Sequence, residues 1–272
     1  MKKLIVALFT LTAIVAAGEN GFSYYNGPLN FKPLAANTFE PRVGLIWHAN
    51  DNRLRLDIGN SVDLIQYRLA NHGGFMTFGA DFFTYTMLRG ERNFHFPVDA
   101  VDYLFGFNVN YRDTLDVGIL SSRLRVSHIS AHFVDGHFDG TAGIWKDGMN
   151  PRVYSREFFD LTIAFEPTDA IRWYAGGLYL WHVDPTSLPL LTGYAGGEYH
   201  YALFSFLHLF GAYQFTATGL RPRHEMMIGS KLGMWQGRGT QIFFTYHYGN
   251  SMHGEYYDRK DEYSGIGFSI DF

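Results

Sequence analysis

The last ten residues of the sequence, 263–272, alternate apolar side chains with small or polar ones and end on an aromatic residue. Successive side chains of a β-strand point to opposite sides, so this alternation places all the apolar side chains on one face. That face would carry Ile266, Phe268, Ile270 and Phe272, and the opposite face Gly265, Gly267, Ser269 and Asp271. The stretch predicts an amphipathic strand, which occurs in soluble sandwiches as well as in membrane barrels.

The same alternation recurs along most of the chain. Between residues 53 and 64 the apolar residues share one parity, while Arg55, Asp57 and Asp63 take the other. Apolar residues outside and charged residues inside, over strands of about ten residues, are typical of a transmembrane barrel. A soluble antiparallel fold would also alternate, but it would not usually need a composition with 18% aromatic residues.

We therefore predict an all-β fold, an antiparallel transmembrane β-barrel of about twelve strands. Ten or fourteen strands are the alternatives, because 203–216 alternates poorly and 73–88 changes phase. An even number places both ends of the chain in the periplasm, with short turns there, for example at 112–113, and longer loops such as 133–154 outside. The expected strands are 42–48, 53–67, 73–88, 97–112, 114–132, 155–166, 170–181, 190–200, 203–216, 222–235, 239–249 and 263–272.

The N-terminus has the pattern of a secretory signal. Met1-Lys2-Lys3 is followed by an apolar run that ends at Ala17, too short for a spanning helix. We expect a signal peptide at 1–17, a periplasmic leader or inward-folded segment at 18–40, and one barrel domain at 41–272. The sequence has no cysteine, and a net charge of −4 argues against a nucleic-acid partner.

Charged residues of both signs fall on the inward parity of the predicted strands. In a barrel of this size we expect them to pair across the lumen, and the alternative is that they line a solvated channel. They are Arg55, Asp57, Asp63, Asp102, Arg112, Arg123, Arg125, Asp160, Arg172, Glu225 and Lys231.

One constellation could carry out chemistry. His128 and Ser130 share the outward parity of the fifth predicted strand, about 6.5 Å apart at Cα. An imidazole at this spacing can deprotonate a serine hydroxyl, and a third group must orient the imidazole. Glu157, outward on the next strand, is the candidate if Ser130 lies opposite residue 157. The alternative is that His128, Ser130 and His132 are interfacial polar residues.

Three resemblances extend this interpretation. The ending on Phe272 resembles the C-terminal signature of bacterial outer-membrane barrels, which their assembly machinery recognises. The His128-x-Ser130 motif resembles the active sites of outer-membrane phospholipase A and of the lipid A deacylases. That resemblance implies Ser130 as nucleophile, His128 as general base and Glu157 as orienting residue. The Asn-Gly that usually follows the serine is replaced here by Ala131-His132, which leaves the oxyanion site without a candidate.

The third resemblance is to an uncharacterised family of Gram-negative outer-membrane barrels. It rests on the segments 31–42 and 74–81 and on His128-Ile-Ser-Ala-His132 with Asp135. It implies an outer-membrane location and a barrel fold but no activity.

A further group of side chains could bind a divalent cation. His132, Asp135, His137 and Asp139 follow one another at the start of the 133–154 loop. Nitrogen and oxygen ligands suit a transition metal, and Ca²⁺ would prefer carboxylates and carbonyls. The alternative is a solvated loop.

Two functions follow from these observations. The first is a membrane serine hydrolase acting on acyl esters of phospholipid or lipopolysaccharide, with Ca²⁺ as a candidate cofactor. The second is a barrel without enzymatic activity, such as a small channel, an adhesin or a structural protein. In both cases we expect outer-membrane lipids, and the assembly machinery acting on Phe272, as partners.

Overall fold

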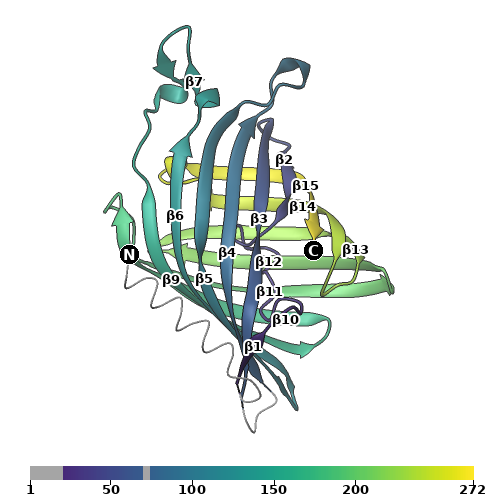
Figure 1. The fold of residues 1–272 in the computed structure, drawn as a ribbon. Helices are drawn as coiled ribbons and strands as arrows, with labels where there is room; N and C mark the ends of the chain where they lie inside the picture. The colour runs from purple at the N-terminus through teal and green to yellow at the C-terminus, as the bar shows by residue number, and fades with distance from the viewer. Residues whose placement is uncertain (1–20, 70–73) are drawn as a thin grey trace.

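A computed structural model describes residues 21–69 and 74–272. In this part of the chain, twelve antiparallel strands form a closed barrel wall (Figure 1). Each strand pairs with its neighbour in sequence, and β15 pairs with β2 to close the barrel. The strands are β2 (Val43–His48), β3 (Arg53–Arg68), β4 (Phe75–Arg89), β5 (Val98–Leu115), β6 (Gly118–Phe133), β9 (Ser155–Thr168), β10 (Ile171–Asp184), β11 (Leu191–Phe204), β12 (Leu207–Thr218), β13 (Arg221–Gly233), β14 (Gly239–Asn250) and β15 (Lys260–Asp271).

The predicted fold class and strand number are confirmed, and one predicted turn is wrong. The chain does not turn at 112–113, because β5 continues to Leu115 and β6 begins at Gly118. Gly118 has a φ of 138°, a conformation that glycine adopts more readily than other residues. The signal peptide predicted at 1–17 lies outside the described residues.

The two ends of the barrel differ. At one end, here called the turn end, β2 begins, β15 ends and the connections are short. At the opposite loop end lie the longer connections 134–154 and 251–259, and the first contains a small hairpin of β7 (Phe138–Asp139) and β8 (Ile144–Trp145). No helix in the described part of the chain is long and apolar enough to cross a membrane.

The segment between the first two strands runs through the barrel interior. The short strand β1 (Phe22–Tyr24) pairs with the far end of β3, whereas β2 pairs with the beginning of β3. Between them, Phe31, Leu34 and Glu40 are buried inside the wall. Residues 30–40 are here called the inward-folded segment.

The inner surface is not uniformly charged. Of the predicted inward charges, all except the half-buried Arg112 are buried. Toward the loop end apolar side chains form a layer, in which Asp57 and Asp102 lie opposite Tyr85 on the neighbouring strands. This layer explains the apparent change of phase in 73–88, because β4 keeps its alternation and turns apolar residues inward. The apolar layer contains Phe83, Tyr85, Leu104, Ile129, Phe158 and Leu180.

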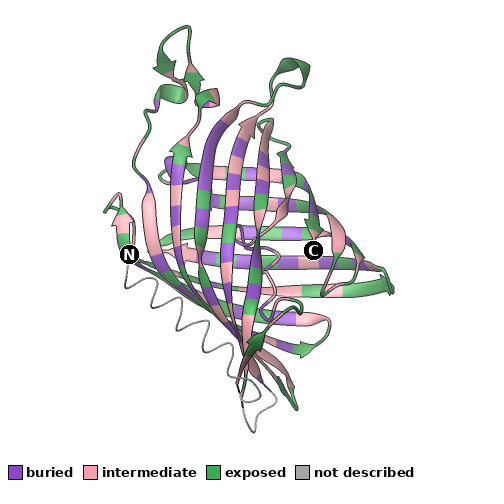
Figure 2. Ribbon diagram, in the orientation of Figure 1, coloured by how far each residue is buried: buried purple, intermediate pink, exposed green. Residues whose placement is uncertain are grey.

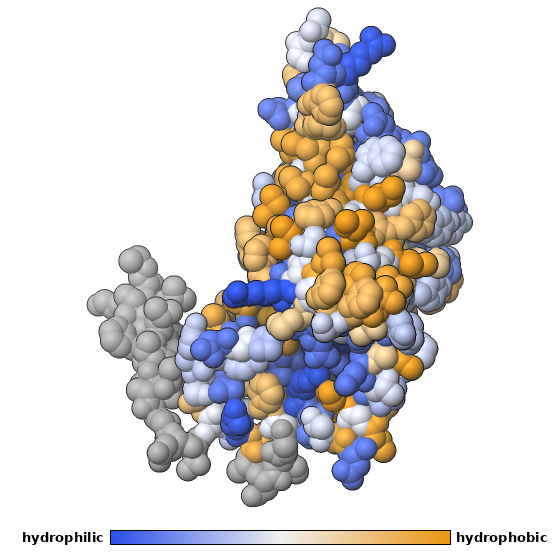
Figure 3. All heavy atoms as spheres, turned by 90° about the vertical axis from the view of Figure 1, so that its right-hand side faces the viewer, coloured by the Kyte–Doolittle hydropathy of each residue, from blue (hydrophilic) through white to orange (hydrophobic). Residues whose placement is uncertain are grey.

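The outer surface of the wall is largely apolar. Along most strands, more buried and more exposed residues alternate (Figure 2), and many exposed ones are large and hydrophobic, such as Phe107, Ile228 and Phe244. Apolar side chains gather over the wall on the face shown in Figure 3. An apolar exterior is what a barrel in contact with lipid requires.

Candidate active site on the outer wall

The centre of the candidate site is a pair of side chains on neighbouring strands. His128 on β6 lies directly opposite Glu157 on β9, and both point outward. Nδ1 of His128 is 2.7 Å from Oε1 of Glu157, a hydrogen-bond distance. About a quarter of each side chain is exposed, so the pair is neither buried nor fully solvated.

The register of β6 against β9 differs from the predicted register by two residues. Ser130 lies opposite Ser155, and His128 takes the place opposite Glu157. The amide of Ala131 donates to the carbonyl of Tyr154, which marks that pair as hydrogen-bonded. Ser130 with Ser155 and His128 with Glu157 are then non-hydrogen-bonded pairs. In such pairs the Cα atoms are about 4.5 Å apart rather than 5.5 Å. This closeness favours the His128–Glu157 contact.

Ser130 shares the outward face with His128 and is half-buried. Among the described residues, no side chain forms a hydrogen bond with its Oγ atom. Because Nδ1 of His128 faces Glu157, the proton-accepting nitrogen of this imidazole is Nε2. His128, Ser130 and Glu157 thus lie on one face of two neighbouring strands. The carboxylate of Glu157 orients the imidazole of His128, and the hydroxyl of Ser130 is two residues away on the same strand.

His182 is a member of this cluster that the sequence did not indicate. Simple alternation along β10 points it inward, but a β-bulge at Trp181 shifts the register between Leu180 and His182. Trp181 and His182 are consequently both exposed. Nδ1 of His182 lies 2.5 Å from Oε2 of Glu157, so this carboxylate contacts one imidazole with each oxygen. Bulges commonly re-aim a side chain in this way, and their position is hard to read from alternation.

The surroundings of the cluster are aromatic. Phe105 on β5 lies opposite His128, with its ring centroid 4.9 Å from the imidazole. On the other side, the rings of Phe159 and Trp181 are 4.4 Å apart. The cluster is therefore a polar group within an apolar outer wall, near the loop end.

The predicted cation ligands do not converge. His132 is exposed on the outer wall, and His137 is buried with its ring stacked 4.3 Å from Phe133. Asp139 instead accepts the amides of Thr141 and Ala142 at the tip of the hairpin. Within residues 21–69 and 74–272, no group of three or more His, Cys, Asp or Glu residues is arranged to hold a metal ion.

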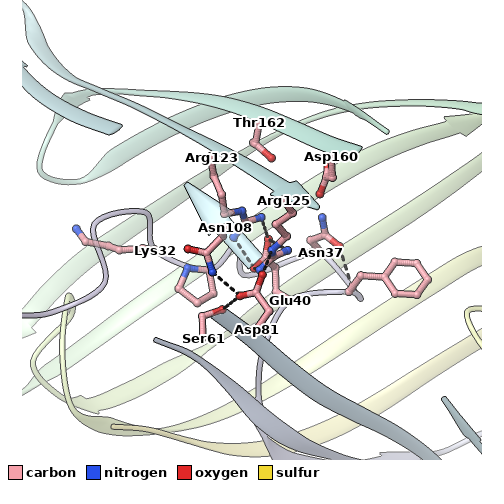
Figure 4. A network of polar contacts seen from close by, with 12 residues as sticks. Lys32, Asn37, Glu40, Ser61, Asp81, Asn108, Arg123, Arg125, Asp160 and Thr162 are labelled. Atoms are coloured by element: carbon pink, nitrogen blue, oxygen red, sulfur yellow. Dashed lines mark hydrogen bonds and ion pairs between the residues drawn. The ribbon is translucent and has the colours of Figure 1, made fainter. Parts of the chain in front are cut away.

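A second polar cluster lies in the lumen. Glu40, from the inward-folded segment, binds Arg123 and Arg125, and Arg125 also contacts Asp81 at 3.2 Å (Figure 4). Ser61 donates to Asp81 over 2.5 Å. These carboxylates are buried and accept several hydrogen bonds each, so the cluster has the properties of a structural network.

A cavity of about 200 Å³ lies at the turn end between the inward-folded segment and the wall. Most charged side chains around it have partners. The pairs are Lys32 with Glu166 at 3.9 Å, Arg172 with Glu198 at 3.6 Å and Lys231 with Asp271 at 2.5 Å. Asp169, which also lines the cavity, is exposed. The charges of these three pairs therefore neutralise one another.

The loop end of the lumen is covered by the connection 251–259. Asp102 lies 2.7 Å from His253 Nδ1 and accepts the amide of Gly254 at 2.7 Å. Burial raises the pKa of Glu255, whose carboxylate accepts the amides of Phe133 and Arg152. Together with the inward-folded segment, this connection occupies the interior from both directions.

Comparisons with known proteins define the family and the fold. The family described as "Protein of unknown function (DUF1207)" matches residues 102–272. This chain belongs to the DUF1207 family. The matched part contains His128, Ser130 and Glu157, whereas the segments 31–42 and 74–81 precede it. No curated protein matches the sequence.

Among solved structures, outer membrane phospholipase A from Escherichia coli has a similar fold. Its TM-score is 0.56 at 10% sequence identity, over 91% of this chain and 94% of that chain. The translocator domain of the autotransporter NalP from Neisseria meningitidis gives a TM-score of 0.38 at 12% identity, over 100% and 95% of the two chains. At 10% identity the likeness to the phospholipase concerns the fold alone, which is that of an outer-membrane barrel.

Proposed function

We propose that this DUF1207 protein is an outer-membrane hydrolase that cleaves acyl esters of lipids at its outer wall. Ser130 is the nucleophile, His128 the general base and Glu157 the residue that orients the base. The observation that carries the proposal is the 2.7 Å contact between His128 Nδ1 and Glu157 Oε1, with Ser130 on the same outward face.

The chemistry follows from the protonation states that this contact favours. A serine hydroxyl is a weak nucleophile until a neighbouring base takes its proton. Glu157 holds the Nδ1–H tautomer of His128, so Nε2 is free to accept that proton, and the carboxylate stabilises the imidazolium that forms. The solved phospholipase A of similar fold bears the name of a lipid hydrolase, which agrees with the proposed substrate class.

The position of the site agrees with a substrate that stays in the membrane. Ser130 lies on the apolar exterior near the loop end, where a phospholipid or lipopolysaccharide ester would lie at the level of the headgroups. A lipid could then reach the serine without entering the lumen, which is filled by residues 30–40.

The decisive experiment measures fatty-acid release from phospholipid and from lipopolysaccharide in detergent micelles, with Ca²⁺ and with a chelator. We expect release by the wild type, and its loss in Ser130→Ala and His128→Ala with unchanged heat-modifiable gel mobility. An inert wild type, or full activity of Ser130→Ala, would leave the barrel without this enzymatic function.

We also propose an outer-membrane location and recognition of Phe272 by the assembly machinery. Cell fractionation should recover the processed protein with the outer membrane, and deletion of Phe272 should lower the assembled fraction. Recovery as a soluble periplasmic protein would contradict the proposed location.

A further inference from the structure

Acyl transfer at Ser130 requires a hydrogen-bond donor for the oxyanion of the tetrahedral intermediate. Such a donor must already be in place beside the nucleophile, since it acts on charge that develops only during the reaction. We propose that the hydroxyl of Ser155 is this donor. The inference rests on the proposed function and extends it by one catalytic residue.

The backbone amide that follows the nucleophile is not available for this role. The N–H of Ala131 donates to the carbonyl of Tyr154 over 3.2 Å, as part of the pairing of β6 with β9. Freeing this amide would break a hydrogen bond between the two strands that carry the site. A side-chain hydroxyl can donate without breaking a hydrogen bond between strands.

Ser155 is the residue that the register places across from Ser130 on β9. The two serines form a directly opposed pair next to the hydrogen-bonded pair of Ala131 and Tyr154. They thus occupy a non-hydrogen-bonded position, where opposed Cβ atoms lie about 4.5–5.5 Å apart. An ester carbonyl attacked by Ser130 would have Ser155 beside it on β9 and His128 two residues away along β6.

The present hydrogen bond of Ser155 is weak enough to be exchanged. Its Oγ donates to Glu157 Oε1 over 3.4 Å, longer than the usual O–H···O distance of about 2.7–2.8 Å. A fully charged oxyanion is a better acceptor, and the hydroxyl can turn toward it by rotation of its side chain.

The reaction begins with attack of Ser130 on the lipid ester. Ser130 Oγ bonds to the ester carbon, its proton moves to His128 Nε2, and the carbonyl π electrons move to oxygen, which accepts a hydrogen bond from Ser155. The C–O bond to the alcohol then breaks, and the alcohol takes the proton from His128. Water hydrolyses the acyl-serine by the same sequence, and Ser155 keeps its proton throughout.

The test compares Ser155→Ala with Ser155→Thr in the full-length protein, using fatty-acid release from phospholipid micelles. We expect Ser155→Ala to lower kcat about 10²-fold with little change in KM, and Ser155→Thr to retain most of the activity. Tyr103, which flanks Ser130 on the β5 side, supplies the control, and Tyr103→Phe should leave kcat unchanged. Heat-modifiable mobility checks that each variant is folded.

A fluorophosphonate probe followed by mass spectrometry separates the possible failures. Labelling of Ser130 in the wild type, together with the loss of kcat in Ser155→Ala, supports the inference. Labelling of Ser130 with full activity of Ser155→Ala would overturn the role of Ser155 and leave the proposed hydrolase intact. Labelling of Ser155 would exchange the roles of the two serines and also overturn the inference. A wild type that neither reacts with the probe nor releases fatty acid would overturn both.

Discussion

Strand β6 carries two very different polar clusters on its two faces. Inward, Arg123 and Arg125 are 3% exposed and are both bound to the buried Glu40. Outward, His128 is about a quarter exposed and has a single carboxylate partner, while Ser130 has no side-chain hydrogen bond among the described residues. The same strand thus contributes to a network in which both arginines share a carboxylate and to a cluster in which one hydroxyl has no side-chain partner.

The difference reflects the surroundings of each face. In a water-excluded interior an unpaired charge is very costly, so the inner charges persist only as a network in which each has partners. At the outer wall, partial exposure tolerates an unpaired hydroxyl and a free imidazole nitrogen. Groups with unused donors and acceptors are the ones that can react with a substrate, and the following predictions test this contrast.

The largest effect should come from removing the inward-folded segment. Replacing residues 30–40 by a Gly/Ser linker of equal length should raise the conductance of the barrel in planar bilayers, because water then fills the turn-end part of the lumen, while the connection 251–259 still covers the loop end. Single-channel recording measures the change, with the wild type as control. A large, steady ohmic conductance of the wild type would favour the channel alternative.

The next largest effect concerns the inner carboxylate. Glu40→Ala leaves two buried arginines without their shared partner and should destabilise the barrel by about 3–5 kcal/mol. The matched outer variant, Glu157→Ala, should lower the free energy of unfolding by less than about 1 kcal/mol, because the ion pairs of Glu157 are partly exposed. Urea unfolding in micelles, followed by tryptophan fluorescence, compares the two. Equal losses of unfolding free energy in the two variants would show that the inner and outer carboxylates contribute equally to stability.

The outer carboxylate should have its main effect on the reaction. In Glu157→Gln the amide can still contact His128 but carries no charge to stabilise the imidazolium, so we expect kcat for lipid hydrolysis to fall about 10–10²-fold. Ser61→Ala, a conservative change in the inner network, should leave kcat unaltered. A reduction of kcat by Ser61→Ala as large as that of Glu157→Gln would argue against a separate outer site.

The smallest effect is expected for His182, which is 67% exposed and contacts only the second oxygen of Glu157. His182→Ala should lower kcat a few-fold by loosening the carboxylate, and His182→Asn, which retains a donor near the Nδ1 position, should restore it. Steady-state kinetics at fixed pH measures both variants. Failure of the asparagine to restore kcat would mean that His182 does not orient Glu157.

Much of the fold could be predicted from local patterns. The alternation in 53–64 and 263–272 identifies strands and their inward and outward faces, since strand geometry has a period of two whatever the surroundings. For the same reason the outward positions of His128, Ser130 and Glu157 followed from parity. The apparent phase change in 73–88 misled because apolarity was used as a proxy for direction, whereas Phe83, Tyr85 and Met87 are apolar and point inward.

What remained undetermined depends on register and on contacts between distant segments. The alternation along a strand does not determine which residue lies opposite Ser130, because a shift of the pairing by two residues keeps every side chain on its face. Only the observed pairing of β6 with β9 places Ser155 there. The bulge that turns His182 outward is a local departure from the period of two. The partnership of Glu40 with Arg123 and Arg125 joins residues more than eighty positions apart, and only closure of the barrel around residues 30–40 brings them together.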